Sequence, residues 1–179
     1  PSLIGLDIGS STVKAIELNL KGKGKGFELK GLGIASLPAE PIVQGAILNS
    51  GTIVDTIREA VDTGGFKTRD VAVAVSGHSV IVKKVSFPAM NREELEDHIQ
   101  WEAEQYIPFD VNEVHLDFPI LDTSEGEGQM DVILVAAKKD LVDDYFQVIS
   151  EAGLNPIAID VAAFAVENAY EQNYDGSAD

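Results

Sequence analysis

The residues most suggestive of chemistry lie near the N-terminus, where an acidic residue precedes a glycine, three hydroxyl residues and a lysine. These residues are Asp7, Gly9, Ser10, Ser11, Thr12 and Lys14. A tight turn of this composition can point several backbone N–H groups at one anion, and the hydroxyl groups add further donors. The pattern predicts a turn that binds a phosphate.

Each residue of this turn has an expected role. Gly9 is expected to adopt a backbone angle that favours glycine and to let a phosphate approach the main chain. Lys14 can supply a positive charge, and Asp7, at the carboxyl end of the first strand, can hold Mg²⁺ through water. The spacing matches neither a P-loop nor a dinucleotide-binding turn. A plain β-hairpin remains the alternative interpretation of the same residues.

The elements that must position this turn are two strands, predicted over residues 3–8 and 12–20. Residues 27–37 form a third strand-like run, and the three runs predict an antiparallel meander that ends at Pro38 and Pro41. Between the second and third runs lies the basic segment 21–26, which alternates Lys and Gly. With no aromatic residue in it for base stacking, it is interpreted as a hairpin tip rather than a nucleic-acid patch.

A helix and a strand complete this first part of the chain. Asn49 or Ser50 can cap the helix, an apolar stripe runs from Ile53, and glycines 64 and 65 end it. Residues 45–49 are expected to be a connector, and residues 71–75 a buried strand. The order of these elements is βββαβ.

The next stretch, residues 80–137, is predicted to be a compact βαββ unit inserted into the chain. Its strands are predicted over 80–87, 113–121 and 130–137, with the acidic segment 122–129 as a hairpin tip. Asn91 and Glu94 have the spacing of a capping box at the start of a helix that runs to Tyr106. Trp101 lies off the apolar stripe of this helix, so it either anchors a partner or packs against a neighbouring subdomain.

The last elements are a helix from Asp140 to Gly153, a strand over 155–160 and an Ala-rich helix over 161–170. Asp160 is predicted to cap the last helix, which is expected to pack against the sheet. Strands and helices alternate along the whole chain, which indicates a layered α/β architecture.

Composition narrows the classes of function. The 179 residues include 13 Lys and Arg, 30 Asp and Glu, and no Cys. An acidic surface disfavours nucleic acid and anionic lipid as partners, and the absence of Cys excludes disulfides and thiolate metal sites. No apolar run approaches the roughly 20 residues of a membrane span, and no leader opens the sequence. A cytoplasmic protein without direct membrane insertion is expected.

Several segments together resemble a known family. Residues 6–14 (L-D-I-G-S-S-T-V-K) resemble the first phosphate motif of the actin, Hsp70 and sugar-kinase superfamily. Residues 85–109, with their W-E-A-E-Q-Y-I-P-F ending, are similar to the PilM family of actin-like type IV pilus assembly proteins and, more distantly, to FtsA. Segments 132–140, 151–156 and 160–165 extend the likeness, which covers about residues 3–170.

The resemblance implies an actin-like ATPase (ribonuclease H-like) fold that binds ATP and Mg²⁺. Residues 3–76 with 155–170 would form subdomain 1A, and residues 80–153 the inserted subdomain 1C. The second actin-like lobe, with the second phosphate motif, would be absent from this chain. The implied cofactor-binding residues are those of the first phosphate motif, with Asp7 as the water-mediated Mg²⁺ residue. They are Asp7, Gly9, Ser10, Ser11, Thr12 and Lys14.

The resemblance also implies a cytoplasmic scaffold at the inner membrane. A groove involving 1A and 1C would receive the cytoplasmic N-terminal tail of PilN, alongside other pilus assembly components. Hydrolysis would need an acid or a carboxamide near the last helix to orient the attacking water. The first turn of this helix offers Ala162, Ala163 and Phe164 instead, and Glu167 and Asn168 come later. Hydrolysis is therefore expected to be weak or absent. The alternatives are an active ATPase or phosphotransferase of the superfamily and an FtsA-like cell-division membrane tether.

Overall fold

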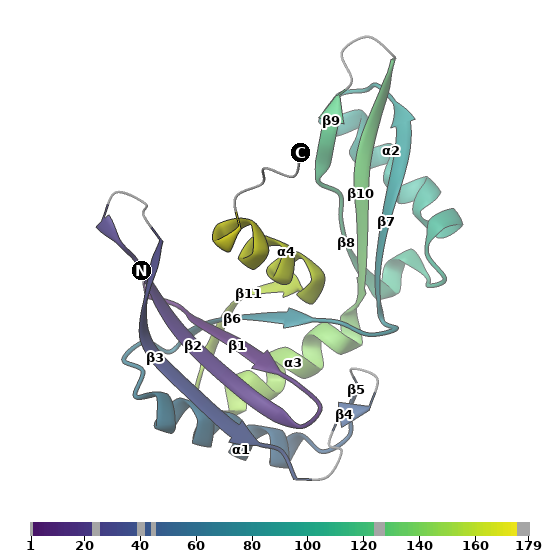
Figure 1. Cartoon of the computed structure of the whole chain (residues 1–179). Coiled ribbons are helices and arrows are strands. Elements are labelled where there is room, and N and C mark those ends of the chain that lie inside the picture. The colour runs from purple at the N-terminus through teal and green to yellow at the C-terminus, as the bar shows by residue number, and fades with distance from the viewer. Residues whose placement is uncertain (1, 23–25, 39–41, 44–45, 124–127, 175–179) are drawn as a thin grey trace. The chain divides into compact units, whose positions relative to one another are not determined.

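The computed structural model divides into two compact units, the first made of residues 1–77 and 143–179 and the second of residues 78–142. The structure describes residues 2–22, 26–38, 42–43, 46–123 and 128–174. The first unit holds the predicted phosphate turn (Figure 1). The second unit ends at Val142, before the expected limit at 153, because the rest of the helix that begins at Lys139 belongs to the first unit. Assignment of the units to subdomains 1A and 1C stays a prediction.

The first unit is built on a five-stranded sheet in the order β11 (Asn155–Val161), β6 (Asp70–Val75), β1 (Ile4–Ile8), β2 (Thr12–Leu20) and β3 (Phe27–Ser36). Strands β1, β2 and β3 are antiparallel neighbours, as the predicted meander requires. Strand β6 lies parallel to β1, and β11 parallel to β6. The carboxyl ends of β1, β6 and β11 therefore meet at one edge of the sheet.

The alternation of side chains along β1 and β2 divides the sheet into a covered face and an open face. Ile4, Leu6 and Ile8 of β1 are buried, while Asp7 between them is exposed. On β2, Val13 and Ala15 are buried on either side of the exposed Lys14. The predicted polar residues therefore stand on the face of the sheet opposite its core.

Helix α1 (Ser50–Gly64) covers the buried face of this sheet. As predicted, the Asn49 side chain accepts a hydrogen bond from the Thr52 N–H at 3.1 Å, and Gly65, with φ at 65°, ends the helix. The helix lies very close to β3, because a Cβ at Gly33 would come within 1.7 Å of the Ala60 carbonyl oxygen. Glycine in this strand is what permits the close packing.

Two further helices are α3 (Lys139–Glu151), which begins within the second unit and continues into the first, and α4 (Ala162–Asn173). Figure 1 shows α1 and α3 on one side of the five-stranded sheet and α4 on the other. The Arg58 guanidinium of α1 donates a hydrogen bond to the backbone oxygen of Glu151, which joins α1 and α3. Helix α4 contacts β11 and β6 of the sheet, as the sequence predicts, although none of its residues is buried.

The second unit is an antiparallel sheet with one helix packed against it. Its strands run in the order β7 (Val80–Pro88), β10 (Gln129–Lys138) and β8 (Val114–Asp117), and β9 (Ile120–Thr123) also pairs with β10. Helix α2 (Arg92–Tyr106) buries Leu95, Ile99 and Ala103 in the core of this unit. Both hydrogen bonds of the predicted capping box are present, at 3.0 Å and 3.1 Å.

Three local predictions are wrong. The expected strand over 113–121 is interrupted after Asp117, because Pro119 has no N–H to donate to a ladder; a short 3-10 helix, η2 (Val111–Glu113), precedes β8. Asp160 does not cap α4: the cap position is Val161, whose N–H donates to the Asp160 carboxylate at 2.7 Å. Residues 46–47 of the expected connector form strand β5 (Ala46–Ile47), which pairs with β4 (Ile42–Val43).

Some predictions fall partly outside the described residues, namely those on segments 21–26, 38–41, 45–49 and 122–129. At the base of the first of these, the Lys21 N–H donates to the Gly26 carbonyl at 2.9 Å, as in a hairpin. No described helix is both long and apolar enough to span a membrane.

Candidate phosphate-binding turn

The predicted phosphate turn is a tight connection between β1 and β2. Ile8 pairs with Val13 across the two strands, which leaves residues 9–12 to reverse the chain. The Gly9 N–H donates to the Thr12 carbonyl at 3.0 Å, and the Leu37 N–H donates to the Ser11 carbonyl at 2.8 Å. The second bond ties the turn to the end of β3, so three strands fix its position.

The backbone of the turn leaves donors available to a ligand. Within the described part of the chain, the N–H groups of Ser10 and Ser11 have no hydrogen-bond partner. Both residues are exposed, and Thr12 is half-buried beside them. Adjacent amides and hydroxyl groups of this kind form a concave site suited to an anion.

The expected role of Gly9 needs correction in one respect. Gly9 is not among the described glycines with positive φ, so the turn does not require glycine for its backbone angle. A Cβ at this position would lie 3.1 Å from the Thr12 carbonyl oxygen and 4.0 Å from Lys14 Nζ. The absence of a side chain therefore keeps the turn tight and its surface open.

Asp7 and Lys14 face each other as a cross-strand pair. The Lys14 Nζ donates to Asp7 Oδ2 at 2.8 Å, and the two side chains are 49% and 65% exposed. Because both are open to solvent, this ion pair contributes little to stability. Both groups can therefore exchange partners, the lysine for a phosphate oxygen and the aspartate for a water ligand of a cation.

Tyr145 of α3, which the sequence predicts only on an apolar helix face, is affected by the charge of Asp7. Burial and, to a lesser extent, the negative charge of Asp7 raise the pKa of the Tyr145 hydroxyl. The phenol is thus within electrostatic reach of Asp7, although the two residues are far apart in sequence. The sequence offers one signal of this electrostatic effect, a tyrosine hydroxyl on a buried helix face. Apolar periodicity alone does not reveal it, because Tyr and Phe fit such a face equally well.

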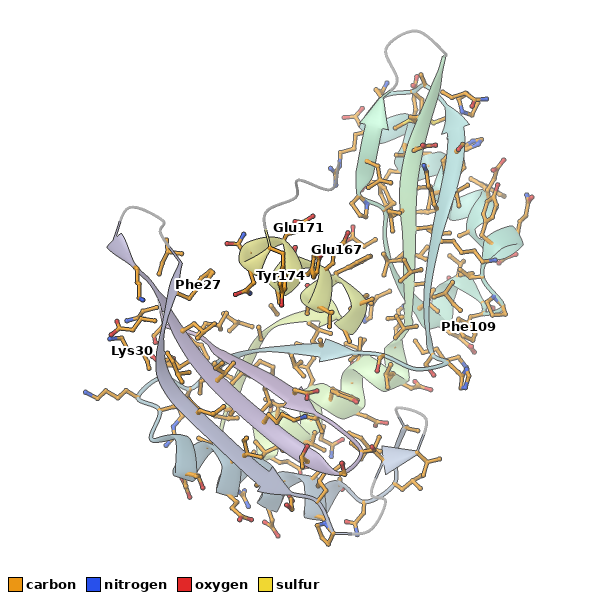
Figure 2. All side chains as sticks on the ribbon, in the orientation of Figure 1. Phe27, Lys30, Phe109, Glu167, Glu171 and Tyr174 are labelled. Carbon is orange, nitrogen blue, oxygen red and sulfur yellow. The ribbon has the colours of Figure 1, made fainter. Side chains whose placement is uncertain are left out.

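The six residues of the predicted phosphate turn lie together, whereas the later candidates Glu167 and Asn168 lie on another element. Figure 2 shows Glu167 on α4, which is separate from the β1–β2 turn. Glu167 and Asn168 are both exposed. Among the described residues no group of three His, Cys, Asp or Glu side chains could hold a metal directly. The free amides and hydroxyl groups of the turn are donors of the kind that a phosphate accepts from, and binding of a nucleotide or a cation there stays a prediction.

Known proteins resemble both the sequence and the fold. A chain in a solved structure described as the PilM–PilN type IV pilus biogenesis complex shares 31% identity with this chain, with a TM-score of 0.83 over 94% of it. The cytoplasmic domain of EpsL, an inner-membrane component of the type II secretion system of Vibrio cholerae, matches 89% of the chain at 15% identity and a TM-score of 0.56. The second likeness concerns the fold alone.

The chain spans 50% of the length of the first of these relatives and 57% of the second. With these neighbours and its mixed five-stranded sheet, the chain has the actin-like ATPase fold that the sequence predicts. The family model described as type IV pilus assembly protein PilM matches residues 5–176. The chain belongs to the PilM family of type IV pilus assembly proteins.

Proposed function

We propose that this chain is part of an ATP-binding, actin-like scaffold that docks the cytoplasmic N-terminal tail of PilN during type IV pilus assembly. The observation that carries the nucleotide part is the β1–β2 turn, with its two unpartnered amides and its exposed Asp7 and Lys14. The partner is suggested by the PilM–PilN complex in which the 31% identical relative was solved. The protein would lie at the inner membrane through such partners.

In this proposal the residues of the turn hold one phosphate group of Mg-ATP. Ser10 and Ser11 donate backbone N–H and hydroxyl groups, and Thr12 adds a third hydroxyl. Lys14 turns from Asp7 to a phosphate oxygen, and Asp7 then holds Mg²⁺ through water. The nucleotide stabilises the conformation that binds partners, and turnover is slow or absent.

Calorimetry of the full-length protein with Mg-ATP tests the nucleotide part. The Asp7→Ala variant is expected to bind Mg-ATP at least about tenfold more weakly, a loss of about 1.4 kcal/mol. In EDTA the same variant is not expected to lose affinity for ATP, because Lys14 is then free to meet the phosphate. Glu28→Gln removes the same charge at the far end of the sheet and serves as the control.

The alternative of an active enzyme is tested by steady-state phosphate release. Turnover by the wild-type protein that disappears in Asp7→Ala would favour an ATPase or phosphotransferase. Failure of the wild-type protein to bind Mg-ATP in the first experiment would reject the nucleotide part of the proposal altogether.

A further inference from the structure

Strands β2 and β3 continue beyond the five-stranded sheet as a two-stranded arm. Pairing of β1 with β2 stops at Ile4 and Glu17, whereas pairing of β2 with β3 runs on to Leu20 and Phe27. In the described part of the chain, residues 18–20 and 27–29 therefore pair only with each other (Figure 1). With a rise of about 3.3 Å per residue, this hairpin arm extends roughly 10 Å past the last pair of β1.

One face of the hairpin arm carries four large apolar side chains. They form two cross-strand pairs, Leu18 with Leu29 and Leu20 with Phe27. These side chains are 43% to 65% exposed, and the residues between them in sequence, on the other face of the arm, are exposed as well. Packing within the described chain does not account for them, and an exposed apolar patch of this kind marks an interaction surface.

The end of the hairpin arm is basic, although the chain as a whole is acidic. Residues 21–30 contain four Lys and one Glu, whereas the whole chain contains 13 Lys and Arg against 30 Asp and Glu. Lys30 forms an ion pair with Glu28 at 2.8 Å, and Lys30, with a smaller effect from the charge of Lys21, lowers the pKa of the Glu28 carboxyl. Among the described residues Lys21 forms no ion pair, so its charge is open to a partner.

Screening by salt lets this local positive charge act separately from the acidic remainder. The Debye length is about 8 Å at physiological ionic strength, and the hairpin arm reaches roughly 10 Å beyond the sheet. Acidic groups on the rest of the surface are therefore largely screened from a partner at the end of the arm. The net charge of the chain disfavours anionic lipid over most of the surface but not at this point.

We propose that the hairpin arm contacts the surface of an anionic phospholipid bilayer. Its lysines meet the phosphates of the headgroups, and its four apolar side chains enter the boundary between headgroups and acyl chains. Because the arm is exposed on both faces, it can lie in the headgroup layer without any rearrangement of the sheet. The contact is peripheral and reversible, since stable attachment takes a second signal.

This contact goes beyond the proposed function, because it requires neither a nucleotide nor PilN. Co-sedimentation of the full-length protein with lipid vesicles, in the absence of both, tests it. The protein is expected to bind vesicles of phosphatidylcholine mixed with phosphatidylglycerol, and to bind vesicles of phosphatidylcholine alone much more weakly. Raised salt is expected to weaken binding to the mixed vesicles, because it screens the lysines from the headgroups.

Two double variants separate the apolar and the charged parts of the contact. Leu20→Ser with Phe27→Ser is expected to weaken binding to the mixed vesicles at least tenfold. Lys21→Gln with Lys30→Gln is expected to weaken it several-fold at low salt and to reduce its dependence on salt.

Matched controls change the same kinds of residue outside the arm. They are Leu48→Ser, at a 68% exposed position, and Lys67→Gln, at an exposed lysine. Neither control is expected to weaken binding to the mixed vesicles. All of the variants are expected to keep the melting temperature of the wild-type protein, because the replaced side chains are exposed, and circular dichroism checks this.

Three results would overturn the proposal. They are no binding to the mixed vesicles, equal binding to both kinds of vesicle, and binding that neither double variant weakens. If the protein binds poly-glutamate but not vesicles, an acidic protein is the partner of the arm instead. Each of these results leaves the proposed function standing, and a failure of PilN or Mg-ATP to bind leaves the lipid contact standing.

Discussion

At the scale of single residues, glycine decides how closely α1 can lie on the sheet. A Cβ at Gly33 would overlap the Ala60 carbonyl oxygen, a backbone atom that cannot move without shifting the helix. Gly33→Ala is therefore expected to destabilise the first unit by about 1–3 kcal/mol or more, through overpacking. At roughly 2–4 °C per kcal/mol for a chain of this size, thermal unfolding should show a clear fall in melting temperature.

Gly22→Ala provides the control for this change. A Cβ at Gly22 would meet no atom within 4 Å, so the melting temperature is expected to stay within a degree or so of the wild-type value. Equal melting temperatures for Gly33→Ala and the wild-type chain would show that α1 does not lie as close to β3 as described.

Tyr145 gives the first unit a specific response to alkaline pH. Its folded-state pKa is raised by burial and by the charge of Asp7, whereas an unfolded tyrosine titrates near pH 10. The folded state keeps a proton that the unfolded state loses, so stability is fully present below about pH 10 and falls as the pH rises through the interval between the two pKa values. Urea unfolding at pH 8 and above pH 10 measures this fall.

Two variants isolate the contribution of Tyr145. Tyr145→Phe removes the ionisable group, so its stability is expected to fall less between the two pH values. Asp7→Asn removes the charge of Asp7, one of the two causes of the raised pKa. The fall in its free energy of unfolding at alkaline pH should therefore lie between the falls for the wild-type chain and for Tyr145→Phe. An identical alkaline loss in the wild-type chain and Tyr145→Phe would contradict the assignment.

At the scale of elements, the capping box at the start of α2 is a sequence signal that the structure confirms. Asn91 accepts from the Glu94 N–H, and Glu94 accepts from the Asn91 N–H. Asn91→Ala is expected to cost about 1 kcal/mol, whereas Asn91→Asp keeps the acceptor and should cost little. Hydrogen exchange of the first-turn amides of α2 measures the effects of both variants. Equal protection of these amides in Asn91→Ala and in the wild-type chain would contradict the role of the cap.

Most element boundaries were predictable because the signals are local. Alternating apolar residues marked β2, and Asn49 and Gly65 marked the two ends of α1. The errors arise where a nonlocal effect prevails. Strand β11 continues through Asp160 because it pairs with β6 up to Val161, which moves the cap of α4, and Pro119 divides an apolar run that otherwise reads as one strand.

The sequence places the candidate residues in one turn, and their role in binding a nucleotide stays a prediction. The composition of residues 7–14 is enough to indicate an anion-binding turn. The bond between Gly9 and Thr12, the tie from Leu37 to Ser11 and the approach of Tyr145 all depend on neighbours that only the folded chain supplies. Trp101 is 85% exposed, which follows from its helical angle off the apolar stripe of α2.

At the scale of the whole molecule, the first unit carries an open apolar face on strands β2 and β3. Three cross-strand pairs form it, and they are Ile16 with Leu32, Leu18 with Leu29, and Leu20 with Phe27. A β-bulge next to Leu18 keeps all three pairs on the same face, and each of these side chains is at least 37% exposed. Figure 2 labels Phe27 toward one end of this hairpin and Tyr174, itself 60% exposed, directly after α4.

Such a contiguous apolar surface is expected to bind the dye ANS in the 179-residue chain. The double variant Leu18→Glu with Leu32→Glu should lower the ANS fluorescence without lowering the melting temperature, because both side chains are already 43% and 48% exposed. Leu48→Glu, at a 68% exposed position outside the face, is the control. No ANS binding by the wild-type chain would mean that this face is covered in solution.

In the proposed function, a nucleotide held at the β1–β2 turn supports the docking of a pilus partner. Calorimetry of the full-length protein with the PilN tail peptide, in the presence and absence of Mg-ATP, measures this coupling directly. We expect the peptide to bind and Mg-ATP to increase its affinity, an effect that Asp7→Ala abolishes. The same peptide affinity with and without Mg-ATP would contradict the coupling, and no peptide binding in either state would contradict the scaffold itself.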